Sequence, residues 1–442
     1  MTSTLASCLT ASSMVKESHL DSSGMQRVAA VILSGGEGSR LAPLTMKTCK
    51  PAVSFGGKYR LIDVPISYAV DAGCKKIYVL TQFLSASLHQ HLFRTYSGLS
   101  SILELLTAEQ RPSMKKWFQG SADAVRQNWE YLAEAPVDYF LILAGDQLYD
   151  IDFRLLVQHA KNTDADLVVA ALPVGESDAT RMGVMSINSD QSIVEFYEKP
   201  QQPELLTRTV IPKWLKEQQG ILGSEERYLA SAGIYVFKKE ALFKLLHKES
   251  GEDFGKHLIP KQISIGKTFA YIHHGYWRDI GTIQSYFEAN MALVSPHSAF
   301  SYHSEKRLFA RPLNLPPPRI NCSRMENVII CEGSSVEGEE IQNSILGPLT
   351  LVKKGCHITR TYLMGQDEHC SSTGSHTSSS HSVVGENCRI EQAIIEKQVS
   401  LGRDVQLVNK NRLSHYNSEH LYVRDGIIIV TRGAVLPDGF VF

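Results

Sequence analysis

Continuous apolar runs rich in β-branched residues recur along the first half of the chain, and polar segments with helical spacing separate them. A short, wholly apolar run bounded by turn residues is typical of a strand that is buried on both faces. Alternation of such strands with helices predicts βαβ units, and therefore an α/β fold with a Rossmann-like, mostly parallel sheet. The predicted strands are residues 28–33, 76–80, 138–146, 166–174 and 229–237.

One of the intervening helices is defined well enough by its side chains to be placed. Ser121 is a suitable N-cap, and Val125, Trp129 and Leu132 then fall on one face. We therefore predict a helix that begins at Ser121 and packs through these three residues.

The hydrophobic pattern changes after a proline cluster, because apolar residues then recur six positions apart with Gly, Asn and Asp between them. A six-residue repeat is typical of a parallel β-helix, in which each short strand buries one aliphatic side chain. In the alternative, an antiparallel sandwich, apolar residues would recur at every second position. The repeating positions are Leu346, Val352 and Ile358, then Val384 and Ile390, then Ile395, Leu401 and Leu407.

These changes of pattern divide the chain into four parts. Residues 1–26 are rich in Ser and Thr and lack periodicity, so we expect a disordered tail, with an organelle transit peptide as the alternative. The α/β domain is expected at 27–295, a Pro-rich linker at 296–318 and the β-helix at 319–442. The Ser- and His-rich segment 370–382 interrupts the repeat; we interpret it as a loop excluded from the coils rather than a metal site.

Composition narrows the range of functions. With 45 Lys and Arg against 46 Asp and Glu, the net charge of −1 provides no chain-wide field for nucleic acid or an anionic membrane. No apolar run approaches the roughly 18 residues that a membrane span needs. The eight Cys are scattered without metal-ligand spacing, as in a reducing compartment. We expect a cytoplasmic protein, or a plastid-stroma protein if the tail is a transit peptide.

The first predicted strand ends in a glycine loop that contains Gly35, Gly36 and Gly38 and is followed by Arg40. Ligands of open parallel sheets bind at the carboxyl ends of strands, and glycines let backbone N–H groups approach phosphates. The loop matches neither the dinucleotide fingerprint nor the Walker loop, so a tight turn with a surface arginine is the alternative. Lys50, ten residues further on, adds a second cation that suits a polyphosphate.

Two acids are candidates for a magnesium site. Asp146 stands at the end of the third predicted strand, although an acid there also suits a helix cap. Asp279 is the candidate second acid, although alone it could pair with Arg278. Mg²⁺ is usually held by one or two carboxylates together with substrate phosphates, so Asp146 with Asp279 would meet that need.

Taken together, these segments resemble one enzyme family in order along the chain, from Val28 to the C-terminus. The family is glucose-1-phosphate adenylyltransferase, also called ADP-glucose pyrophosphorylase. The segments that carry the resemblance are SGGEGSRLAPLT, KPAV, YRLIDVPIS, YVLTQFLSASL, WFQGSADAVRQ, AGDQLYDID, EFYEKP, SAGIYVF and YWRDIGT.

The resemblance implies a Rossmann-like nucleotidyltransferase domain followed by a left-handed parallel β-helix. It also implies that ATP and α-glucose 1-phosphate react to give ADP-glucose and pyrophosphate, the committed step of glycogen or starch synthesis. The implied catalytic residues are Arg40, Lys50, Asp146 and Lys199. The implied nucleotide-binding residues are Gly35, Gly36, Gly38, Gln110 and Trp117. The implied sugar-phosphate residues are Gly183, Glu198, Lys199 and Ser231, and the implied Mg²⁺ ligands are Asp146 and Asp279.

The resemblance further implies a homotetramer controlled by phosphorylated metabolites at a basic site between the two domains. The implied effector residues are Lys47, Arg60, Lys397 and Arg424. Two positions depart from the family pattern: Thr48 stands where an arginine is usual, and Arg424 replaces a lysine. Both departures bear on regulation by effectors more than on the catalytic reaction.

Two alternatives to an active adenylyltransferase stay open at this point. One is a regulatory subunit without activity, although such copies tend to lose the loop arginine, the KPAV lysine or the metal aspartate, and Arg40, Lys50 and Asp146 are all present. The other is a transferase for a different nucleotide, because the fold does not determine the base.

Overall fold

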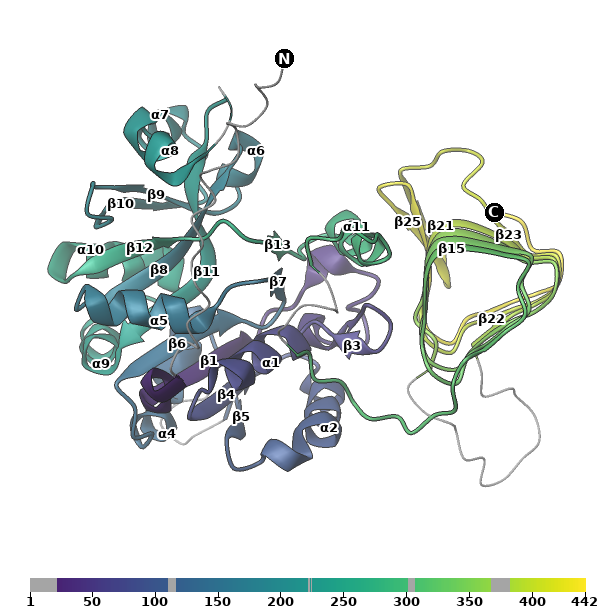
Figure 1. Cartoon of the computed structure of the whole chain (residues 1–442), viewed down its shortest axis with the longest axis horizontal. Helices are drawn as coiled ribbons and strands as arrows, with labels where there is room; N and C mark the ends of the chain where they lie inside the picture. The colour runs from purple at the N-terminus through teal and green to yellow at the C-terminus, as the bar shows by residue number, and fades with distance from the viewer. Residues whose placement is uncertain (1–21, 110–116, 222, 224, 301–306, 367–381) are drawn as a thin grey trace, which may run out of the picture.

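The predicted strands lie in one mixed sheet of nine strands (Figure 1). The structure is a computed structural model that describes residues 22–109, 117–221, 223, 225–300, 307–366 and 382–442. Along the sheet the strand order is β10-β9-β11-β6-β1-β4-β5, and β8 pairs with β11 and with β12. The strands are β1 (Val28–Ser34), β4 (Lys76–Thr81), β5 (Leu103–Thr107), β6 (Tyr139–Ala144), β8 (Leu167–Val174), β9 (Gly183–Ile187), β10 (Ile193–Glu198), β11 (Tyr228–Lys238) and β12 (Thr268–Ile272).

All five predicted strands are present, and the sheet is mostly parallel, as predicted. β1 is parallel to β4 and β6, and β12 is parallel to β8. β11 is the exception among the predicted strands, because it runs antiparallel to β6, β8 and β9; β10 is likewise antiparallel to β9. An apolar run carries no information on strand direction, so this reversal could not be foreseen.

Helices cover both faces of the sheet, which explains why its central strands are apolar throughout. Alternate side chains of β1 enter different clusters: Val28, Ala30 and Ile32 pack on one face, and Ala29 and Val31 on the other. The first face is covered by α1 (Asp63–Ala72), α2 (Ser85–Tyr96), α5 (Phe153–Asn162) and α11 (Ile283–Leu293). The second is covered by α3 (Ser121–Gln127), α4 (Trp129–Ala133), α9 (Lys239–Lys248) and α10 (Ile259–Ile265). Figure 1 shows α6 (Glu176–Ala179), α7 (Pro203–Arg208) and α8 (Lys213–Gln219) together at the end of the domain near β9 and β10.

The helix predicted from Ser121 needs two corrections. Val125, Trp129 and Leu132 are buried together, as predicted, but the helix is interrupted at Asn128 and becomes α3 and α4. Ser121 does not cap it either. Its hydroxyl donates to Asp253 and accepts from the backbone N–H of Phe254, so it joins two segments instead.

The packed part of the chain begins earlier than predicted. Ser22–Arg27 forms a 3-10 helix, η1, in which Met25 is buried and Arg27 pairs with Asp138. The predicted tail therefore includes residues that pack on the α/β domain, while residues 1–21 lie outside the described part of the chain.

The C-terminal domain is a triangular prism of stacked strands that pair in parallel except at the β24–β25–β26 edge (Figure 1). All eight residues of the predicted six-residue repeat are buried in it. Ile341 aligns with Ile358, and Ile390 with Leu407, so each of these two coils takes 17 residues, whereas the coil from Met325 to Ile341 takes 16. Of the predicted excluded loop, Ser382 belongs to β20 and the rest lies outside the described residues. One face of the prism contains β14 (Arg319–Ile320), β16 (Ser335–Val336), β18 (Thr350–Val352), β20 (Ser382–Val384), β22 (Ser400–Leu401) and β27 (Val435–Leu436). A second contains β15 (Arg324–Ile330), β17 (Glu340–Leu346), β19 (His357–Leu363), β21 (Arg389–Ile395), β26 (Ile427–Val430), β25 (Leu421–Arg424) and β24 (His415–Asn417), and β23 (Gln406–Leu407) pairs with β21.

The prism packs against the α/β domain through an outward-facing apolar stripe. Ile345, Tyr362, Ile394 and Ile429 align across β17, β19, β21 and β26 and belong to the same apolar cluster as α11. The hydroxyl of Tyr362 also accepts from the backbone N–H of Gly57, in the hairpin of β2 (Ser54–Phe55) and β3 (Tyr59–Arg60). Within the described residues, no helix combines the length and the apolar character that crossing a bilayer requires.

We predict that Ile390→Ala destabilises the prism by about 2–5 kcal/mol, because Ile390 is fully buried between Ile358 and Leu407 and the neighbouring coils cannot collapse into the space. Urea unfolding followed by circular dichroism measures the change. Arg389→Ala, an exposed position on the same strand, is the control and should stay within about 0.5 kcal/mol of wild type. Equal unfolding midpoints for the two variants would contradict the prediction.

Candidate active site

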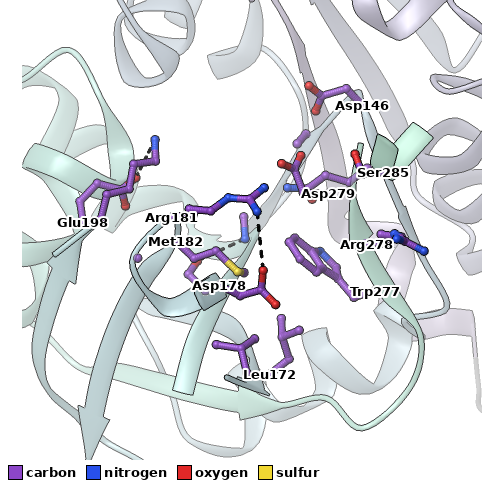
Figure 2. Close-up of a pocket in the computed structure, with 18 of the residues that line it drawn as sticks. Asp146, Leu172, Asp178, Arg181, Met182, Glu198, Trp277, Arg278, Asp279 and Ser285 are labelled. Atoms are coloured by element: carbon purple, nitrogen blue, oxygen red, sulfur yellow. Dashed lines mark hydrogen bonds and ion pairs between the residues drawn. The ribbon is translucent and has the colours of Figure 1, made fainter. Parts of the chain in front are cut away.

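A cavity of about 1300 Å³ opens where β1, β6 and β8 end. It is the place where a sheet of this kind binds ligands, because the loops that follow parallel strands meet there. Figure 2 shows acidic, basic and apolar side chains around it. Most of the residues assigned by resemblance line this one cavity: Gly36, Arg40, Lys50, Gly183, Glu198, Lys199, Ser231, Asp146 and Asp279.

An irregularity in β11 divides the cavity into two halves. The first part of β11 pairs with β9 and the last part with β6, and the register shifts between Ser231 and Tyr235. Gly233 sits in the shift with φ of +72°, and a Cβ there would lie 2.9 Å from Gln147. The strand therefore places Ser231 between an acidic half next to β6 and a second half next to β9 and β10.

The two candidate metal ligands come together through a short antiparallel pair of strands. β7 (Gln147–Tyr149) follows Asp146 directly, and β13 (Trp277–Asp279) pairs with it so that Asp279 lies opposite Gln147. Neither alternative for these acids applies: Asp146 stands between two strands and caps no helix, and Arg278 pairs with Glu288 instead of Asp279.

Lys50 provides the cation between the two acids. Its Nζ atom lies 2.6 Å from Asp146 Oδ2 and 3.8 Å from Asp279 Oδ1. The lysine is only 8% exposed, because the 3-10 helix Lys50–Ala52 packs it beneath the glycine loop. Three segments that are distant in sequence thus meet around one ammonium group.

The glycine loop forms the wall beside this charged cluster. Gly36 and Arg40 line the cavity, whereas Gly35 and Gly38 do not. Gly38 has φ of +66°, and a Cβ there would lie 2.9 Å from the Cβ of Lys50, so a larger residue would disturb the lysine. Its role is therefore to shape the loop rather than to form the cavity wall.

Of the two predicted adenine-side residues, only Trp117 belongs to the described part of the chain. Trp117 is exposed and does not line the cavity, and Gln110 lies outside the described residues. The next residue, Phe118, approaches the loop instead: its backbone N–H donates to Gln82, and both side chains neighbour Gly35.

The other half of the cavity is built around Glu198, whose Cα is the register partner of Gly183. Burial raises the pKa of Glu198, although the nearby Lys199, 3.3 Å away, acts in the opposite direction. Lys199 is the more exposed of the two, at 63% against 25%, and has φ of +49°. This half also contains Asp253, whose charge acts on Glu198.

Comparison with known families agrees with this arrangement. Residues 29–295 match the nucleotidyl transferase family, and residues 313–441 match the GLGC left-handed parallel β-helix domain. The combination of the two domains is decisive. The chain belongs to the ADP-glucose pyrophosphorylase family.

A second cavity, of about 340 Å³, lies between the two domains. Lys47, Arg60 and Lys397 line it, as does Thr48, whose hydroxyl lies 2.8 Å from that of Ser87. This cavity brings together three of the four residues that were predicted to bind effectors.

Arg424, the fourth residue predicted to bind effectors, does not line the second cavity. Its guanidinium donates to the carbonyls of Tyr416 and Val423 and to the side chain of Asn417, which commits it to the β24–β25 hairpin. Arg432 lines the cavity instead. It stands two residues after the end of the buried strand β26, and that position was the only available indication.

The second cavity also holds an acid that the pattern of basic residues could not reveal. Glu396 accepts from the backbone N–H of Arg432, and burial raises its pKa against the lowering effect of Arg432, Lys47 and Lys397. Glu419 lines the cavity as well, so its cations already share the cavity with two carboxylates.

Other residues of the large cavity were missed because no spacing rule selects them. Asp253 accepts from Ser121 and from the backbone N–H of Lys256, and the indole N–H of Trp277 donates to the carbonyl of Ala232. Both line the cavity. Trp277 neighbours the predicted ligand Asp279 in sequence, whereas Asp253 lies in a segment with no other candidate.

We predict that Gly183→Ala destabilises the enzyme by about 1–3 kcal/mol, because the new Cβ would lie 2.4 Å from the ring of Phe196 and 2.8 Å from the carboxylate of Glu198. Thermal unfolding measures the effect. Gly175→Ala is a matched control, since Gly175 lines the same cavity and no atom lies within 4 Å of a Cβ there. Identical melting temperatures for the two variants would show that β9 and β10 adjust freely.

Proposed function

We propose that this enzyme transfers the adenylyl group of ATP to α-glucose 1-phosphate and releases pyrophosphate. The observation that carries the proposal is the convergence of Lys50, Asp146 and Asp279 in the same cavity as Glu198 and Lys199. The end of the cavity with Lys50, Asp146 and Asp279 suits a polyphosphate. The end with Glu198 and Lys199 suits a sugar phosphate.

In this reaction a phosphate oxygen of glucose 1-phosphate attacks the α-phosphorus of ATP, and the bond from that phosphorus to the pyrophosphate oxygen breaks. No covalent intermediate with the protein is needed, so the residues act by positioning and by stabilising charge. Arg40 and Lys50 would face the triphosphate. Glu198 would accept hydrogen bonds from sugar hydroxyls, and Lys199 would bind the phosphate of glucose 1-phosphate.

The acidic half of the cavity fits a magnesium ion. Asp146 and Asp279 already share one cation, the ammonium of Lys50, and offer only hard oxygen donors. The described residues contain no cluster of three metal-ligating side chains, which suits an ion that takes its remaining ligands from phosphates. A bound Mg²⁺ would neutralise negative charge on the reacting phosphates.

The presence of Arg40, Lys50 and Asp146 in one cavity favours an active enzyme over a regulatory subunit. The decisive experiment measures pyrophosphate release from ATP, UTP, GTP and dTTP with glucose 1-phosphate and Mg²⁺. We expect turnover with ATP. Turnover with another nucleotide alone would identify a different transferase, and no turnover with any nucleotide would favour the regulatory subunit.

We predict that Asp146→Asn lowers kcat by about 10²-fold or more while the fold is retained, because one of two carboxylates for the cation is lost. Steady-state kinetics over a range of Mg²⁺ concentrations measures the change, with circular dichroism to check folding. Asp190→Asn, an exposed acid outside the cavity, is the control and should behave as wild type. Near-normal kcat for Asp146→Asn at saturating Mg²⁺ would refute the assignment.

We also propose that the second cavity binds anionic metabolites and that the protein works as a homotetramer, as its family resemblance suggests. Lys47, Arg60, Lys397 and Arg432 supply positive charge, Glu396 and Glu419 offset part of it, and Thr48 adds none. An effector acts only through different affinities for two states of the enzyme. We therefore expect weak regulation or an altered choice of effector.

We predict that Thr48→Arg strengthens the binding of inhibitory phosphate, because a guanidinium adds charge and a bidentate donor to the cavity. Dose–response curves for phosphate and for sugar and glycerate phosphates measure the change. Thr48→Val, which removes the hydroxyl without adding charge, is the control. If wild type responds as strongly as Thr48→Arg, position 48 has no part in effector binding.

A further inference from the structure

Arg181 is a cavity residue to which the reaction described above assigns no role. It lies in the segment between β8 and β9 that includes α6, and both Asp178 and Arg181 line the active-site cavity. Figure 2 shows the Arg181 side chain projecting into the cavity, with Glu198 on one side and Trp277 and Asp279 on the other. A guanidinium at this position stands between the sugar half and the acidic half.

The backbone holds Arg181 close to Lys199. The N–H of Lys199 donates to the carbonyl of Met182 at 3.0 Å, and Glu198 pairs with Gly183 across β9 and β10. Arg181 therefore approaches from the chain segment that is bonded directly to the predicted phosphate-binding lysine.

The contacts of Arg181 leave it able to bind an anion. Its Nη1 atom lies 3.9 Å from Asp178 Oδ1, which is longer than a hydrogen bond, and both side chains are about half exposed, at 54% and 57%. An ion pair this long and exposed contributes little to stability. Arg181 can therefore leave Asp178 and bind an anionic ligand at hydrogen-bond distance.

The charge of the substrate calls for more than Lys199 alone. A phosphate monoester carries a charge of about −1.5 to −2 at neutral pH. Lys199 supplies one positive charge, and Glu198 lies 3.3 Å from it. A planar guanidinium adds a second charge and two parallel donors that match phosphate oxygens.

We propose that Arg181 binds the phosphate of the sugar phosphate substrate together with Lys199, and that Asp178 holds the guanidinium in place while the cavity is empty. This inference rests on the proposed function. Because the same phosphate remains attached to the sugar in the nucleotide sugar product, Arg181 contacts it in both directions of the reaction. The residue is a determinant of affinity for the sugar phosphate and not for ATP.

The test compares the kinetics of Arg181→Ala, Arg181→Lys, Asp178→Asn and Lys199→Ala with wild type. A contact made equally in the ground and transition states affects KM and leaves kcat nearly unchanged. We expect Arg181→Ala to raise KM for glucose 1-phosphate about 10- to 100-fold, as loss of a charged hydrogen bond does, with KM for ATP within about twofold. Arg181→Lys should recover part of the loss, and Lys199→Ala should show the same selectivity for glucose 1-phosphate.

Asp178→Asn separates substrate binding from a structural role. Without its competing carboxylate, Arg181 should bind the substrate equally well or better, so KM for glucose 1-phosphate should be unchanged or lower. Arg208→Ala is the matched control, since Arg208 is similarly exposed, pairs with Glu195 and does not line the cavity. Its kinetics should equal those of wild type.

The inference is overturned if Arg181→Ala leaves KM for glucose 1-phosphate within about twofold, or if KM rises equally for both substrates. It is also overturned if Asp178→Asn raises KM as Arg181→Ala does, because the ion pair would then only brace its own segment. Absence of turnover in wild type would refute the proposed function separately. Calorimetric titration with glucose 1-phosphate would then test the role of Arg181 without turnover. That role requires Arg181→Ala to bind glucose 1-phosphate more weakly than wild type does.

Discussion

The ion pairs of Lys50 with Asp146 and Asp279 are the constraint on which the cavity depends. A buried lysine beside two carboxylates holds the three groups together, since without Lys50 the two like charges of Asp146 and Asp279 would face each other with no cation between them. The pairing of β7 with β13 brings the acids side by side, and the close fit of Gly38 against Lys50 sets the position of the cation. The charged cluster is thus determined by backbone geometry before any substrate arrives.

The two cavities share one stretch of chain. Arg40 and Lys50 line the large cavity, whereas Lys47 and Thr48, which stand between them in sequence, line the cavity between the domains. A ligand that shifts Lys47 therefore acts on a segment that also positions Lys50. This connection is short and covalent, and it requires no chain of contacts through the core.

The parts of the fold that follow from repeated local patterns were predictable from sequence. The apolar runs specify β1, β4, β6, β8 and β11, and the six-residue spacing specifies the buried positions of the prism, because both patterns result from burial at regular intervals. Features that depend on a distant partner were not predictable. Ser121 bonds to Asp253 instead of capping its helix, and Arg424 bonds to its own hairpin while Arg432 lines the cavity. Motif resemblance brought Glu198 and Lys199 to attention, but Arg181 belongs to no motif and is recognised only by the cavity that it faces.

An apolar stripe couples the stability of the two domains. It consists of Ile345, Tyr362, Ile394 and Ile429. These side chains point out of the prism and are buried in the same cluster as α11 and the central sheet. A catalytic domain separated from its prism would expose a continuous apolar surface to water, with the associated tendency to aggregate. The two domains therefore differ in topology but do not fold independently of each other. We expect the whole chain to unfold as a single cooperative unit.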